Sequence, residues 1–129
     1  MNEQPVMEAG ASAMVSLAAE TRFAPNGIVS RTLLRTATTR TVLFGFAAGQ
    51  ELTEHTSTQD ALIHILTGEC EFMLDSQQHL LKAGDLLHLS PNLPHAVKAI
   101  TQFSMLLTLS KAEAPAASPR NLNLNPTNK

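Results

Sequence analysis

The sequence predicts an all-β barrel or sandwich, and three observations support this fold class. Apolar and polar residues alternate with a period of two in several segments. Gly, Pro and Asn turns separate these segments at intervals of about ten residues. Outside the N-terminal arm, no segment shows a 3.6-residue period with helix caps. The 129 residues, 43% of them hydrophobic, are enough for one domain with one continuous core.

The expected strands follow one another from the Asn26-Gly27 turn onward, six to eight in number. Residues 75–78 are polar and predict a hairpin turn between two of the strands. Residues 61–66 form an almost continuous apolar run, which is typical of a strand covered on both faces. The expected strands span residues 27–35, 40–47, 61–66, 69–74, 79–82, 86–89 and 101–109.

Alternation within these strands predicts which side chains face the core. The predicted inward-facing residues include Val42, Phe44, Phe46, Cys70, Phe72, Leu74, Phe103, Met105, Leu107 and Leu109. The two ends of the chain differ from this central part. We expect residues 1–16 to form a mobile N-terminal arm and residues 17–110 to form the barrel. Residues 111–129, rich in Pro, Asn and Ala, are expected to be a disordered tail.

Composition argues against several classes of partner. The net charge of −2 and the lack of any Lys/Arg run give no field that attracts nucleic acid, and there is no Trp or Tyr on which bases could stack. No apolar run approaches the roughly 20 residues of a membrane span, and no signal peptide is evident. The single cysteine, Cys70, is interpreted as a buried core residue. It cannot form an intramolecular disulfide, which suits a reducing compartment, so we expect a cytoplasmic protein.

Two segments resemble the paired motifs of the cupin family. The segment from Gly49 through His55 to Gly68 resembles the first motif, G-x5-H-x-H-x3-E-x6-G. The segment from Gly84 to His95 resembles the second motif, G-x5-P-x-G-x2-H-x3-N. The resemblance extends over residues 28–109 and implies a small single-domain cupin of the conserved barrel type, that is, a double-stranded β-helix or jelly-roll barrel.

The turn residues of the motifs fit this fold physically. Gly68 and Gly84 lie between expected strands, where a positive φ or a tight bend is needed. Asn92 replaces the glycine of the second motif, and asparagine is among the few residues that tolerate a left-handed conformation.

The metal-ligand set implied by the resemblance is incomplete. In metal-binding cupins the first motif supplies two histidines and a glutamate, and the second motif supplies a third histidine. Here Ser57 stands at the second histidine position and Ala61 at the glutamate position, so only His55 and His95 remain. Alanine cannot ligate, and serine is a poor ligand for a divalent metal.

Other side chains are candidates to complete a shell with His55 and His95 around Mn, Fe, Ni or Zn. Gln59 and Asp60 lie on the loop that leads into the strand at 61–66 and could turn inward. His64 is three residues after Ala61, so simple alternation points it to the opposite face unless a bulge intervenes.

Three function classes stay open at this point, and whether the protein is an enzyme is undecided. The first is a metal-dependent enzyme, the second a metal-free barrel that binds or senses a small molecule, and the third a structural or regulatory homodimer. The mostly aliphatic motif segments favour a small ligand that is neutral or apolar. A homodimer is expected through the strand at 27–35, where Ile28 and Leu34 are candidates for an exposed edge.

Overall fold

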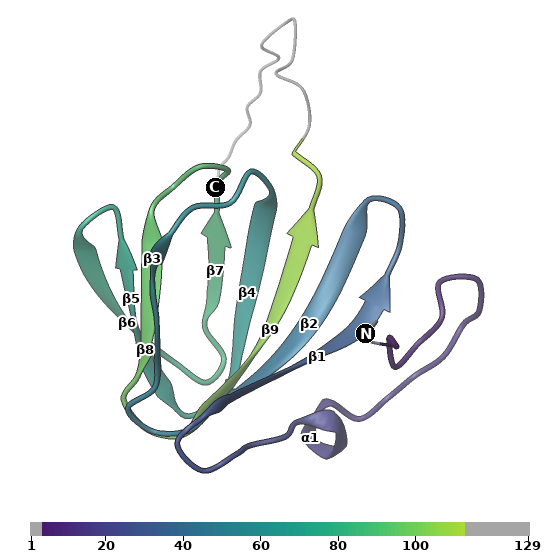
Figure 1. Cartoon of the computed structure of the whole chain (residues 1–129), viewed down its shortest axis with the longest axis horizontal. Helices are drawn as coiled ribbons and strands as arrows, with labels where there is room; N and C mark the ends of the chain where they lie inside the picture. The colour runs from purple at the N-terminus through teal and green to yellow at the C-terminus, as the bar shows by residue number, and fades with distance from the viewer. Residues whose placement is uncertain (1–3, 113–129) are drawn as a thin grey trace, which may run out of the picture.

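The computed structural model describes residues 4–112, which contain nine β-strands and one short helix joined by loops (Figure 1). The all-β jelly-roll prediction is confirmed. The helix within residues 4–112 is not long and apolar enough to cross a membrane. The elements are α1 (Leu17–Glu20), β1 (Ile28–Arg35), β2 (Thr39–Phe46), β3 (Glu51–His55), β4 (Asp60–Thr67), β5 (Glu69–Leu74), β6 (Gln77–Lys82), β7 (Leu86–Leu89), β8 (His95–Ala99) and β9 (Phe103–Ser110).

The strands form two antiparallel sheets that face each other (Figure 1). One sheet has the order β1-β2-β9-β4-β7, and the other has the order β3-β8-β5-β6. The expectation of six to eight strands was too low, because β3 and β8 were not predicted. Each of these strands has only five residues, and their sequences, ELTEH and HAVKA, lack clear alternation. The hairpin turn is also tighter than expected: Asp75 and Ser76 both have positive φ, and β6 begins at Gln77.

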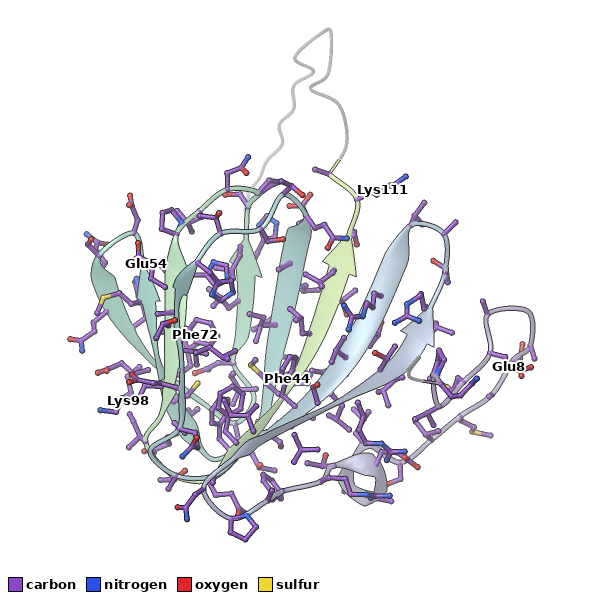
Figure 2. The ribbon with its side chains drawn as sticks, viewed as in Figure 1. Glu8, Phe44, Glu54, Phe72, Lys98 and Lys111 are labelled. Carbon is purple, nitrogen blue, oxygen red and sulfur yellow. The ribbon has the colours of Figure 1, made fainter. Side chains whose placement is uncertain are left out.

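The main core lies between the two sheets and follows the predicted alternation, while Leu33 on β1 and Leu43 on β2 are buried as well. Figure 2 shows Phe44 and Phe72 extending into this space from opposite sheets. Phe46, at the end of β2, stacks on Phe103, at the start of β9, with ring centroids 4.5 Å apart and planes at 26°. Both rings are fully buried. This stacked pair fills the end of the barrel where β2 finishes and β9 begins.

The strand β4 corrects one sequence-based prediction. The apolar run at 61–66 predicted cover on both faces, but only Ala61, Ile63 and Ile65 are buried. Leu62 is 42% exposed and His64 is exposed as well. The strand therefore alternates in burial although its composition does not, because no second layer formed by residues 4–112 covers this part of the outer face.

The N-terminal segment crosses the outer side of the first sheet (Figure 1). The backbone N–H groups of Val6 and Met7 donate to carbonyl oxygens on β1 at 3.0 and 2.7 Å. Farther along, the backbone around Arg22 approaches β2 so closely that a Cβ on Gly45 would lie 2.0 Å from the Arg22 carbonyl oxygen. Glycine is therefore required at position 45. Whether residues 1–16 are mobile stays a prediction, and residues 113–129 of the expected tail lie outside the described residues.

The turns behave as the motif residues predicted. Gly68 and Gly84 have φ values of 76° and 95°, and Asn92 adopts the left-handed conformation with φ of 70°. The Asn92 N–H donates to the Ser57 carbonyl oxygen at 2.7 Å. This bond connects the loop before β8 to the loop before β4. Both loops lie at the end of the barrel where His55 pairs with His95.

Candidate functional site

A cavity of about 270 Å³ opens into the barrel between the two sheets. Its polar lining residues come from four positions around one end of the barrel: the end of β3, the loop before β4, the end of β7 and the start of β8 (Figure 1). Its walls are aliphatic and aromatic. The lining residues are Phe44, Leu52, His55, Ser57, Gln59, Ala61, Ile63, Phe72, Leu89, Ser90, His95, Val97, Met105, Leu107 and Leu109.

A register shift places His55 in this cavity. Leu52 and His55 are three residues apart on β3, so strict alternation would point them to opposite faces. The pairing of β3 with β8 shifts between these two residues, and both line the cavity. His95 reaches the cavity by ordinary alternation, since Val97 two residues later also lines it. His55 then pairs directly with His95 across the two strands.

The two imidazole rings lie 4.3 Å apart between centroids, at an interplanar angle of 59°. The Nδ1 atom of His55 lies 2.8 Å from the Thr53 carbonyl oxygen, and the Nδ1 atom of His95 lies 2.8 Å from the Leu93 carbonyl oxygen. A carbonyl oxygen can only accept, so each Nδ1 must carry the proton and donate it. In the neutral ring Nε2 then holds a lone pair. Neither Nε2 atom has a hydrogen-bond partner among the described residues.

The other predicted ligands are divided between the cavity and the outer surface. Gln59 lines the cavity. Asp60 does not; its Oδ1 lies 3.0 Å from Nε2 of His88, which is exposed on the outer face of β7. His64 is exposed on the outer face of β4, as simple alternation indicated, and no bulge brings it inward. Of the five residues predicted as ligands, the structure brings together His55, His95 and Gln59, while Asp60 and His64 face elsewhere.

Ser57 and Ala61, which occupy the missing ligand positions, both line the cavity. The Ser57 Oγ accepts from the Gln59 N–H at 3.1 Å, which leaves the hydroxyl proton available to a ligand. Sequence reasoning missed Ser90 as a lining residue. Its position directly after β7, at the same end as His95, was the available signal.

The cavity contains very little charge. No Asp, Glu, Lys or Arg of residues 4–112 lines it. Within the same range, no three His, Cys, Asp or Glu side chains are grouped so that they could hold a metal ion. The donor set therefore fits a divalent metal in part: two imidazole nitrogens and one amide oxygen are present, but the carboxylate and the third imidazole of the family motif are absent.

Cys70 is not part of this site. The side chain is completely buried in the core, as predicted. Burial, followed by the nearby negative charge of Asp85, raises the pKa of the Cys70 thiol to about 12. A thiol of this kind is neither a nucleophile nor a metal ligand at neutral pH.

Comparison with known proteins agrees with this architecture. The family profile described as "Cupin domain" matches residues 42–109, so the chain belongs to the cupin family. A conserved protein of unknown function from Streptococcus pyogenes is similar at 29% identity and a TM-score of 0.75, covering 88% of this chain and 98% of its own. A cupin superfamily protein from Desulfitobacterium hafniense shows 26% identity and a TM-score of 0.73, with coverages of 79% and 94%. None of the curated proteins matches the chain.

Proposed function

We propose that this cupin binds a small, largely apolar molecule in its barrel cavity. The composition of the cavity carries the proposal: ten of the fifteen lining residues have aliphatic or aromatic side chains, and the polar ones are His55, Ser57, Gln59, Ser90 and His95. Pockets for small molecules are typically apolar with a few polar groups that fix orientation. The apolar walls would hold the body of the ligand, and the polar groups at the rim would contact its polar end.

Ethylbenzene is a suitable probe, because a cavity of about 150 Å³ is already large enough for benzene. We expect saturable binding that perturbs the methyl resonances of Met105 and Leu107. The Ala61→Leu substitution adds bulk inside the cavity and should abolish binding while leaving the protein folded. Leu62→Ala changes the adjacent, outward-facing residue and should bind like wild type. Equal binding by all three proteins would place the ethylbenzene elsewhere and contradict the proposal.

A divalent metal bound by Nε2 of His55 and Nε2 of His95 is the second candidate. One observation favours it: each Nδ1–H is anchored to a backbone carbonyl, which is how metal-ligating histidines are commonly oriented. Gln59 would add an amide oxygen, and the metal would act as a Lewis acid toward the ligand. Titration of Mn²⁺, Fe²⁺, Ni²⁺ and Zn²⁺ into wild type and His95→Ala tests this candidate. Equal binding by both proteins would exclude the histidine pair as the site.

We propose further that the protein acts as a homodimer in the cytoplasm. Support for the dimer comes from β1, the edge strand of its sheet, where Ile28 and Leu34 are only partly buried and the bonds from Val6 and Met7 involve only the Thr32 and Leu33 carbonyls. Support for the compartment comes from Cys70, which is a free, buried thiol.

A further inference from the structure

We infer that the polar end of the ligand is an uncharged hydroxyl group, and that the ligand is a ring-sized alcohol or phenol. The inference rests on the proposed function, since it names the ligand class of the same cavity. Its starting point is the pair of hydrogen bonds from Nδ1 of His55 and His95 to the carbonyl oxygens of Thr53 and Leu93, each 2.8 Å long.

These two bonds determine what the histidine pair offers to a ligand. Because both Nδ1 atoms donate to the backbone, both neutral rings offer only the lone pair of Nε2. The rings lie side by side on β3 and β8, tilted by 59° with centroids 4.3 Å apart, so both lone pairs belong to one small region of the rim. A ligand group that binds there must supply a hydrogen-bond donor. An acceptor without a proton, such as an ether oxygen or a carboxylate, would meet lone pairs instead.

Neighbouring side chains favour a group that accepts as well as donates. Ser57 Oγ accepts from the Gln59 N–H and donates to no group among residues 4–112, so its proton is available to a ligand. The Gln59 side chain, which lines the same cavity, can donate through its amide. A hydroxyl group satisfies both kinds of partner: its proton goes to an imidazole Nε2, and its oxygen accepts from Ser57 or Gln59.

With both imidazoles neutral, the lining offers no charge that could pair with an ionic ligand head. A carboxylate would need a cation, and neither Lys nor Arg among residues 4–112 lines the cavity. An ammonium would need a carboxylate, and Ala61 stands where the cupin motif has glutamate. The cavity of about 270 Å³ sets the size of the ligand. It exceeds the roughly 150 Å³ that suffices for benzene, which leaves room for one ring with a short substituent.

Four probes of similar shape test this inference on protein freed of metal with a chelator: 4-ethylphenol, 1-ethyl-4-fluorobenzene, ethylbenzene and 4-ethylbenzoate. The measurement is made at pH 8.5, where free imidazole is neutral and a phenol keeps its proton. We expect 4-ethylphenol to bind about three- to tenfold more tightly than the fluoro compound, the ratio typical of one net hydrogen bond. We expect 4-ethylbenzoate to bind most weakly.

Substitutions then assign the preference to the histidines. His55→Leu and His95→Leu should each reduce the ratio between the phenol and fluoro affinities while keeping ethylbenzene binding, a result that a merely structural role would not give. His79→Leu, at an exposed position on β6, is the matched control and should keep the ratio. If the phenol, fluoro compound and hydrocarbon bind equally to wild type, the hydroxyl inference is wrong and cavity binding stands. Tightest binding of the benzoate also overturns the inference, and no binding of any probe refutes the proposed function itself.

Discussion

Replacing Gly68 by alanine tests the tight turn between β4 and β5. Gly68 has φ of 76°, and a Cβ added there would lie 2.1 Å from the Gln102 carbonyl oxygen and 2.7 Å from the Phe103 Cβ. Two costs therefore combine. The left-handed conformation costs an alanine about 1–2 kcal/mol, and moving the adjacent backbone costs about 1–3 kcal/mol more. The free energy of unfolding should fall by about 2–5 kcal/mol in total.

Two other glycines separate these costs. Gly84 has φ of 95° but no atom within 4 Å of an added Cβ, so Gly84→Ala should lose only the conformational part, about 1–2 kcal/mol. Gly10 has neither a positive φ nor a close neighbour, and Gly10→Ala should change stability by less than about 0.5 kcal/mol.

Urea unfolding of the three variants measures these changes in the free energy of unfolding. In a thermal melt, each kcal/mol lost should lower the melting temperature by about 4–8 °C. Asparagine tolerates the left-handed conformation, so Gly84→Asn should recover part of the loss while Gly68→Asn should not. Equal losses in Gly68→Ala and Gly84→Ala would show that the contact with Gln102 adds nothing, and the reasoning from steric overlap would be refuted.

Three further predictions concern the site, the core and the assembly. Ser57→His combined with Ala61→Glu should tighten Zn²⁺ binding at least tenfold, about 1.4 kcal/mol, because both positions line the cavity; unchanged affinity in a calorimetric titration would show that the new side chains do not reach the metal. The raised pKa of Cys70 means that the folded state keeps a proton that the unfolded state loses, so stability should fall as pH rises from about 9 to about 12. Cys70→Ala should remove this part of the decline in urea titrations, and an identical pH profile would contradict the assignment. Light scattering at micromolar concentration should give about twice the 13.9 kDa monomer mass, and the monomer mass would count against pairing through β1.

The positions of the two histidines were predictable from the sequence to different degrees. His95 follows a turn in which Asn92 takes the left-handed conformation, and this was expected from the residue type. His55 was expected in the cavity only through the family motif. Its place in the cavity lining depends on the register shift between Leu52 and His55, which has no signature in the residues ELTEH. A bulge is a property of the strand pair, and a single strand's alternation does not contain it.

The outward direction of Asp60 and the exposure of β4 show a second limit. Asp60 was a candidate ligand because it is on the loop before the cavity wall, but it pairs with His88 across two neighbouring strands. This pairing depends on β4 lying beside β7, a long-range arrangement that local patterns do not determine. In the same way, the apolar run in β4 suggested two covered faces. Leu62 is nevertheless 42% exposed, since composition cannot tell which part of a sheet lacks a neighbouring layer.

Ala61 connects the missing metal ligand with the nature of the cavity. In metal-binding cupins a glutamate at this position would bring a negative charge and a long side chain to the inner face of β4. Ala61 is instead buried in the wall of the cavity, between Ile63 on the same face and Leu89 on the paired strand β7. The same residue thus removes a charge that would need a metal or a cation to offset it, and leaves the space that an apolar ligand can occupy. With Ser57 at the second histidine position, the two histidines that remain keep their anchored Nδ1 atoms and offer two Nε2 lone pairs to an uncharged cavity. Ser57 and Ala61, the two departures from the family motif that line the cavity, therefore act in the same direction: each replaces a candidate metal ligand by a small, uncharged side chain.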